Sequence, residues 1–121
     1  MAHKVDGGGL RYNDGKLRFD LIPPDVLREL AKVLTRGARK YAERNWERGM
    51  KWSNCRASKE RHWNDWLRGR RVDPESVKGM RTRTLAHEIV NTMFLLAYEL
   101  RGLRKLDDIE PFMRAKARAK K

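Results

Sequence analysis

TRTLAHEIVNTMFLLAYELR, residues 82–101, is the stretch that decides the fold class. Large apolar residues recur in it at steps of three or four, which places them along one side of an α-helix. Ala86, Val90 and Ala97 widen that side. Gly102 follows, and glycine often ends helices because it tolerates a left-handed backbone. The stretch therefore predicts one long helix with a broad face buried against other helices.

Two further helical patterns precede this one. An apolar stripe runs over residues 24–36 behind Pro24, a residue that suits the first turn of a helix. Gly37 interrupts the stripe, so we expect a break or kink over residues 35–37 and a second short helix to about residue 44. The next helix is expected to begin at residue 53 or 54 and to end at Gly69.

The two ends of the chain give weaker signals. Residues 1–9 contain GGG and are expected to be disordered. The turn sequence Asn13-Asp14-Gly15 predicts a short hairpin or an extended arm. Asp107 and Asp108 are placed to begin a last short helix. The chain is therefore predicted to be mainly α, a small bundle of four to five helices, with one domain over 10–110 and a basic tail over 111–121.

The composition limits location and ligand class. A single cysteine, Cys55, excludes an intrachain disulfide and favours a reducing cytoplasm. We find neither a signal-peptide core nor an apolar run of membrane length, so we expect no membrane partner. The net charge of +13 favours phosphorylated ligands, either nucleotides or nucleic acid. The tail RAKARAKK, residues 114–121, is either a solvated helix end or an arm that contacts phosphates.

The helix predicted to end at Gly69 carries a crowded polar group. His62, Asp65 and Trp66 share one face because they lie three and four residues apart, and Glu60 and Arg61 adjoin them. A carboxylate and an imidazole on one face can bind a divalent metal or exchange a proton. His62 can equally pack in the core while Glu60 pairs with an arginine, so the spacing leaves both interpretations open.

The long helix and the connection before it add polar candidates. His87, Glu88 and Asn91 stand in an otherwise apolar helix. If buried they need partners, because an unpaired buried polar group costs about 1–3 kcal/mol. They therefore form a site, satisfy one another, or lie at a helix edge. Asp73 and Glu75 offer hard oxygen ligands that suit Mg²⁺, or act as ordinary ion-pair partners.

Tryptophans are concentrated in the middle of the chain. Trp46, Trp52, Trp63 and Trp66 lie among many cations. Aromatic rings mixed with cations stack on bases and neutralise phosphates, which favours a base pocket beside the polar residues. On the same grounds KYAERNW, residues 40–46, is either a core segment or one wall of that pocket.

Five segments in order carry a resemblance to a known family: GKLRFDLIPP (15–24), KYAERNW (40–46), RHWNDWLRG (61–69), DPE (73–75) and LAHEIVN (85–91). With these segments the chain resembles the phage-associated dATP/dGTP diphosphohydrolase-type domain. That family is similar to the all-α nucleoside triphosphate pyrophosphohydrolases of MazG type. The connection after DPE is longer than the family's, and Thr84 stands where the family has a histidine.

The resemblance implies an oligomeric, phage-encoded enzyme in the host cytoplasm. Such an enzyme cleaves a purine deoxynucleoside triphosphate to the monophosphate and pyrophosphate with Mg²⁺. For this function the candidate metal ligands are Glu60, Asp65, Asp73 and Glu75. The candidate catalytic residues are His62, His87 and Glu88. The candidate substrate-binding residues are Lys40, Tyr41, Asn45, Trp46, Arg61, Trp66 and Asn91.

Two other functions fit the same residues. The E-E-x-x-E cluster of the MazG-type enzymes is not visible as such, which favours a non-catalytic, nucleotide-sequestering phage protein on the same fold. The charge alone favours a basic nucleic-acid-binding module, whose affinity would fall steeply with salt.

Overall fold

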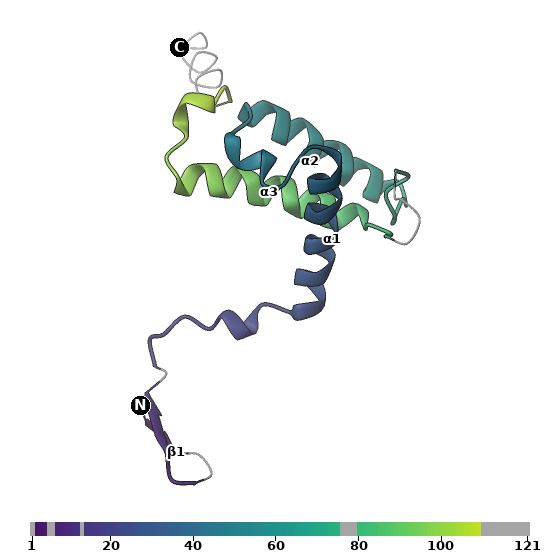
Figure 1. Cartoon of the computed structure of the whole chain (residues 1–121). Coiled ribbons are helices and arrows are strands. Elements are labelled where there is room, and N and C mark those ends of the chain that lie inside the picture. The colour runs from purple at the N-terminus through teal and green to yellow at the C-terminus, as the bar shows by residue number, and fades with distance from the viewer. Residues whose placement is uncertain (1, 5–6, 13, 76–79, 110–121) are drawn as a thin grey trace, which may run out of the picture.

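Three α-helices form the body of the chain in a computed structural model that describes residues 2–4, 7–12, 14–75 and 80–109. They are α1 (Pro24–Lys40), α2 (Trp52–Leu67) and α3 (Thr84–Leu100). Figure 1 shows α2 running alongside α3 while α1 crosses the pair. The predicted mainly α fold and the long helix over 82–101 are confirmed.

The core lies where α1 meets α3. Val33 of α1 packs with Ala86 and Val90 of α3, and all three are buried. The partly buried residues around them are Leu30, Leu34, Met93 and Phe94. Most of these positions belong to the apolar stripes predicted from the sequence, but Val33 and Phe94 do not. Part of each predicted stripe is exposed, including Leu27 of α1 and Leu96 and Leu100 of α3, so periodicity identified the buried faces only in part.

The predicted break at Gly37 is wrong. α1 continues through it to Lys40, and the Tyr41 N–H donates to the Gly37 carbonyl at 2.9 Å. Glycine costs a helix only about 1 kcal/mol relative to alanine, which the packing on both sides of this position outweighs. The described residues therefore hold three α-helices and three short 3-10 turns, Phe19–Leu21, Asn45–Arg48 and Arg104–Leu106, instead of four to five helices.

Asp108 contacts the start of α2. The last short helix expected after Asp108 lies outside the described residues. The Asp108 carboxylate accepts the backbone N–H of Ser53 at 2.9 Å and its hydroxyl at 2.5 Å. It thereby satisfies a free donor in the first turn of α2, a place where a carboxylate also stabilises the helix dipole.

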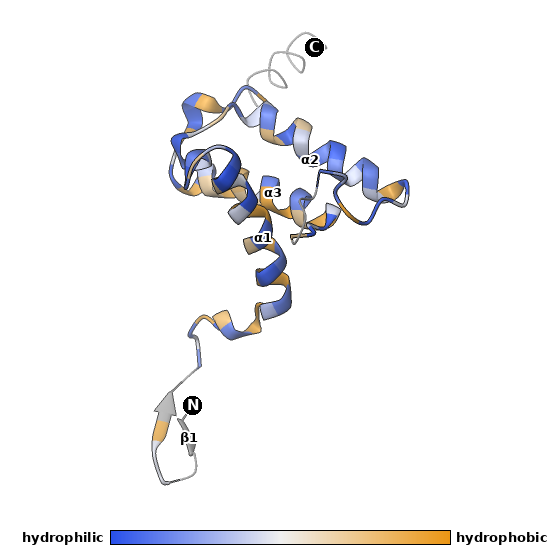
Figure 2. Cartoon of the chain, turned by 45° about the vertical axis from the view of Figure 1, so that its right-hand side comes forward, coloured by the Kyte–Doolittle hydropathy of each residue, from blue (hydrophilic) through white to orange (hydrophobic). Residues whose placement is uncertain are grey.

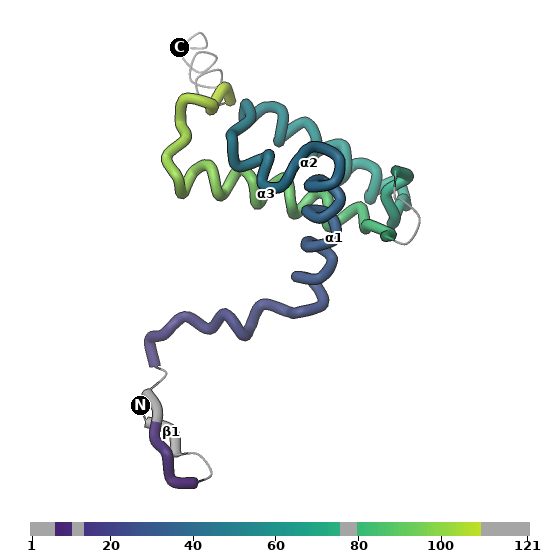
Figure 3. Tube along the Cα trace, viewed as in Figure 1, coloured from purple at the N-terminus to yellow at the C-terminus, as the bar shows by residue number. Residues whose placement is uncertain are grey.

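An N-terminal arm leaves the helices and ends in a hairpin. Strands β1 (Ala2–Lys4) and β2 (Leu10–Tyr12) pair antiparallel, with Ala2 opposite Tyr12. The hairpin therefore closes through the glycines, where Gly7 and Gly8 have positive φ, and not at the predicted turn Asn13–Gly15. Figures 1 and 3 show the arm extending away from α1. The division into a disordered N-terminus, a domain and a basic tail stays a prediction.

No helix in the described part of the chain is both long and apolar enough to cross a membrane.

Candidate functional site

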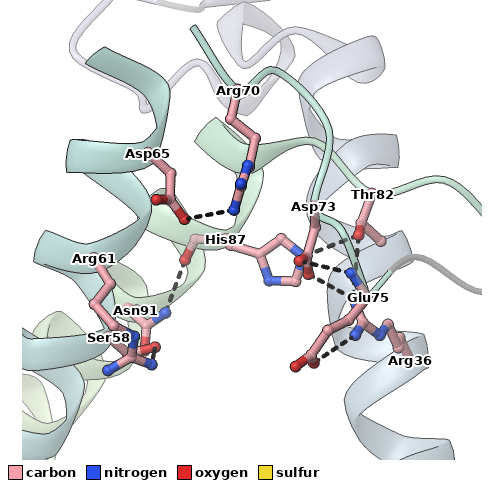
Figure 4. A network of polar contacts seen from close by, with 10 residues as sticks. All are labelled: Arg36, Ser58, Arg61, Asp65, Arg70, Asp73, Glu75, Thr82, His87 and Asn91. Carbon is pink, nitrogen blue, oxygen red and sulfur yellow. Dashed lines mark hydrogen bonds and ion pairs between the residues drawn. The ribbon is translucent and has the colours of Figure 1, made fainter. Parts of the chain in front are cut away.

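Asp73, in the connection after α2, is the centre of a polar network (Figure 4). Its Oδ2 accepts a hydrogen bond from Arg36 Nη1 at 2.6 Å and lies 2.9 Å from His87 Nε2. Arg36 also contacts Glu75 Oε2 at 3.0 Å and Thr82 Oγ1 at 3.3 Å. Asp73 is only 8 % exposed, so these partners replace water around its charge. The network joins α1, the connection and α3.

Backbone pairing holds Asp73 over the start of α3. The Asp73 N–H donates to the Thr82 carbonyl at 2.9 Å, and the Thr84 N–H donates to the Arg71 carbonyl at 3.2 Å. Val72 and Arg83 form the intervening antiparallel bridge. The two ends of the connection are thereby fixed against each other, which sets the height of the Asp73 carboxylate relative to His87, one turn into α3.

Two imidazoles meet beside this carboxylate. The rings of His62 on α2 and His87 on α3 stack with centroids 4.7 Å apart and planes at 22°. Burial lowers the pKa of His87 to about 4, although the Asp73 charge opposes this. Burial also lowers the pKa of His62. Both rings are therefore neutral at pH 7.

The charge of Asp73 decides which nitrogen of His87 carries the proton. Burial by itself would raise the pKa of Asp73, but hydrogen bonds from the Glu75 N–H and Arg36, with the nearby His87, hold it below its ordinary value. The carboxylate is therefore ionised at pH 7 and can only accept. The 2.9 Å contact is favourable when His87 Nε2 carries the proton, which leaves the lone pair on Nδ1. Nδ1 can accept a proton or a hydrogen bond.

A family model identifies the proteins to which this chain is related. The model described as "dATP/dGTP diphosphohydrolase, N-terminal" matches residues 6–108. The chain belongs to this family. The match covers all three helices and every residue of the network, and it confirms the resemblance found in the sequence. No curated protein and no solved structure matches the chain.

Within this diphosphohydrolase domain, the remaining candidates on α2 and α3 lie close to the network. Asn91 Nδ2 donates to the His87 carbonyl at 2.9 Å, one turn back on the same helix. Arg61 contacts Ser58 Oγ at 3.4 Å, and within the described part of the chain it forms no ion pair with a carboxylate. Glu88 pairs with Lys59 at 3.4 Å across the two helices. Figure 4 places Arg61 and Asn91 on the α2 side of His87, opposite Arg36 and Glu75.

The candidate metal ligands are not brought together. Glu60 pairs with Arg56 at 3.1 Å, Asp65 lies 3.9 Å from Arg70, and Asp73 and Glu75 share Arg36. Among the described residues, no group of three or more His, Cys, Asp or Glu side chains could hold a metal ion. A resident Mg²⁺ bound only by these side chains therefore does not fit this arrangement of the diphosphohydrolase domain.

KYAERNW lies at the other end of α3 from the network. Trp46 stacks on Phe94 with ring centroids 4.7 Å apart, and its carbonyl accepts the Tyr98 hydroxyl at 2.6 Å. Phe94 is seven residues after His87, about 10 Å along the helix. Asn45 opens the 3-10 turn that carries Trp46. Trp46 is partly buried and thus packs against α3 in this structure.

Lys40 and Tyr41 are exposed at the end of α1. Tyr41 is 65 % exposed, and Lys40 Nζ lies 5.2 Å from its ring centroid. Tyr41 therefore does not continue the buried stripe of α1, and neither residue contacts the Asp73 network.

Sequence reasoning missed Arg36 and Thr82. Arg36 follows Val33 by three residues, so an arginine on the buried side of α1 was a usable signal that a carboxylate faces it. The expected helix break at Gly37 hid this signal. No sequence signal pointed to Thr82, because its contact with His87 at 2.9 Å depends on the backbone pairing of the connection.

The two histidines predict how stability changes with pH. The unfolded chain binds protons on histidine near pH 6.5, whereas native His87 does so only near pH 4. Stability is therefore full above pH 6.5 and falls as pH drops towards 4. We expect a loss of about 2 kcal/mol between pH 7 and 4.5. Asp73, whose pKa is lowered, weakens the fold only at still lower pH.

Urea denaturation at several pH values measures this effect. His87→Gln should flatten the dependence, and His3→Gln, which removes the third histidine, should leave it unchanged. An equally steep loss in His87→Gln would contradict the assignment to His87.

Proposed function

We propose that this domain hydrolyses dATP or dGTP to the monophosphate and pyrophosphate. The observation that carries the proposal is the pairing of a buried, ionised Asp73 with a neutral His87. A neutral imidazole with one nitrogen held by a carboxylate is in the protonation state that a general base requires. The family to which the chain belongs is described as a diphosphohydrolase of these two nucleotides.

In the proposed reaction a water attacks the α-phosphorus of the nucleotide. His87 Nδ1 accepts the water proton, a new P–O bond forms, and the bond from the α-phosphorus to the bridging oxygen breaks. Pyrophosphate leaves with the electrons of that bond. The Asp73 carboxylate, 2.9 Å from Nε2, stabilises the imidazolium that forms. His62 fixes the ring plane by stacking on it.

Cations on the α2 side of His87 suit the phosphates. A cavity of about 200 Å³ is lined by Asp65, Arg68 and Arg70, and Figure 4 shows the Asp65–Arg70 pair beside His87. Arginines bind phosphate oxygens in pairs of hydrogen bonds. Mg²⁺ enters here as part of the substrate, the Mg–nucleotide complex. Such a complex needs only one or two protein carboxylates, and Glu75, 70 % exposed, is free enough to reach it.

A panel of the four dNTPs, with and without Mg²⁺ and read by product identity, tests the proposal. We expect dAMP or dGMP together with pyrophosphate, and only with Mg²⁺. Release of inorganic phosphate, or no product from any dNTP, would contradict it.

The charge pairing favours a second candidate, a non-catalytic nucleotide-binding protein. Each candidate metal ligand already faces an arginine. A protein of this kind would bind nucleotide without Mg²⁺ and release it intact. The same panel separates the two candidates, because it recovers either product or unchanged nucleotide. Phage origin, a cytoplasmic location and nucleic-acid binding by the basic tail stay predictions.

We also propose that the chain forms a homo-oligomer through its arm. Leu17, Phe19 and Leu21 are 81 %, 74 % and 69 % exposed just before α1, and Figure 2 shows apolar positions along this segment. A monomer rarely leaves so many large apolar side chains in water. α3 presents a second exposed set, Ile89, Leu96 and Leu100.

The charge distribution favours a second copy of this chain as the partner that covers these exposed apolar side chains. Residues 17–31 hold two basic and three acidic residues, and 84–100 hold two acidic and no lysine or arginine. Two chains of net charge +13 repel each other everywhere else, so these stretches are where they can approach. Both surfaces are on one chain, so a symmetric pair can bury both.

Replacing Phe19 and Leu21 by glutamate tests the arm. We expect the mass from light scattering to fall to that of one chain, 14.3 kDa, with an unchanged circular-dichroism spectrum. Leu67→Glu, at an exposed leucine on α2, is the matched control and should keep the mass. A wild-type protein that is already monomeric would refute the oligomer.

A further inference from the structure

Two tryptophans and an arginine form a stacked ladder on α2, separate from the His87 network. The rings of Trp63 and Trp66 stack with centroids 5.2 Å apart and planes at 19°. The Arg71 guanidinium lies 4.4 Å from the Trp66 ring centroid, and its Nη1 donates to the Trp66 carbonyl at 2.6 Å. Trp63 is 44 % exposed. Arg71 thus holds the Trp66 end of the stack in place, and the Trp63 ring at the other end is exposed to solvent.

The open ring faces a different direction from the catalytic candidates. His62 and Trp63 are consecutive, so their side chains leave α2 about 100° apart. His62 points at α3, where it stacks on His87. A ligand on Trp63 therefore lies around the helix from the network and is not the nucleotide held beside His87.

The surface around the ladder is basic and incompletely neutralised. Residues 51–71 contain seven lysines and arginines and two acidic residues. Both acids already face arginines, Glu60 at Arg56 and Asp65 at Arg70. In the described part of the chain, Arg71 forms no ion pair with a carboxylate. Arg56 lies seven residues before Trp63, two turns back on the same face of α2, and its side chain is 53 % exposed.

We propose that this ladder binds single-stranded nucleic acid. An unpaired base continues the stack on the open face of Trp63, and neighbouring phosphates contact Arg56 and Arg71. The strand must be single because the base faces of a duplex are already stacked on one another. A free nucleotide offers phosphates at one point only, whereas Arg56 and Arg71 lie on either side of Trp63, one about two turns before it on α2 and the other beyond the end of that helix. An apolar protein partner would leave the cations unneutralised.

The test is fluorescence anisotropy with a labelled oligothymidylate of about 12 nucleotides, a length that covers a typical single-strand site. A pyrimidine strand avoids the proposed purine nucleotide site. Trp63→Ala should weaken binding about five-fold or more, because a base–aromatic stack contributes that much, and Trp63→Phe should keep most of it. Tyr41→Ala, at an exposed aromatic elsewhere, should bind as the wild type does.

Salt dependence tests the arginines separately. Arg56→Gln should reduce the slope of log affinity against log salt by about 0.7, the value for one phosphate contact on a single strand. Thermal melting confirms that each variant is folded.

Four results would overturn the proposal. They are no binding by the wild type, wild-type affinity in folded Trp63→Ala, complete loss on removing residues 110–121 alone, and competition by dATP as strong as by the oligonucleotide. Each of the first three results would show that no single strand binds to the ladder. The fourth makes its ligand a free nucleotide.

Discussion

Arg36→Ala should lower the free energy of unfolding by about 3 kcal/mol, the usual loss when one partner of a buried ion pair is removed. Arg36 Nη1 contacts Asp73 Oδ2 at 2.6 Å, and the two side chains are 14 % and 8 % exposed. Without the guanidinium, the Asp73 charge still faces His87, which is neutral, and the Glu75 N–H, but it has lost its cationic partner. The same change removes the ion pair between α1 and the connection that carries Asp73. Stability and the geometry of the site should therefore be lost together.

A second arginine in the chain provides the control. Arg18 contacts Asp20 through two hydrogen bonds, at 2.8 and 2.7 Å, but both side chains are more than half exposed. Arg18→Ala should leave stability unchanged, because water replaces the lost contacts. Urea denaturation of both variants at pH 7 measures the difference. Equal stabilities would show that burial adds nothing to the Arg36 pair.

The spacing of apolar residues predicted where the helices lie but not where they are interrupted. The long helix expected over 82–101 is α3, Thr84–Leu100, because its apolar spacing leaves one solution. Gly37 was misjudged because its local preference is weak beside the packing of Val33 on Ala86 and Val90. No local rule indicates that tertiary contacts will carry a helix through a glycine.

Sequence patterns indicated polar candidates on each element but could not show which of them meet. Asp73, His62 and His87 were separate candidates, and only the backbone pairing of 72 with 83 brings Asp73 to the histidines. Trp46 was expected beside the site, and it packs on Phe94 instead. A tryptophan beside charged residues suits a pocket wall and a core equally well, and only the tertiary fold separates the two.

The acidic residues show most clearly what the sequence alone could not predict about the site. In this chain of net charge +13, each candidate metal ligand faces an arginine, and Glu88 faces Lys59. A pattern of acids that suits a metal in the sequence can thus become a set of ion pairs in the fold. The spacing of acids alone cannot decide between these outcomes, because the cations that compete with the metal come from other elements.

His87→Gln should reduce dNTP turnover by about 10²–10⁴-fold, the usual contribution of a general base. Glutamine can keep an N–H donor where His87 Nε2 now faces Asp73, 2.9 Å away, so the network and the fold should persist. It cannot accept a proton as Nδ1 does. Nucleotide affinity should therefore stay near the wild-type value while turnover falls, which initial rates and equilibrium binding measure separately.

His62→Phe is the matched control for this variant. Phenylalanine keeps a flat ring to stack on His87, where the two imidazoles now lie 4.7 Å apart, but it carries no nitrogen. If His62 acts by fixing the plane of His87, turnover in His62→Phe should fall much less than in His87→Gln. The reverse order would assign the proton transfer to His62. Full turnover in His87→Gln would remove the Asp73–His87 pair from the reaction, because no other function of that nitrogen survives the substitution.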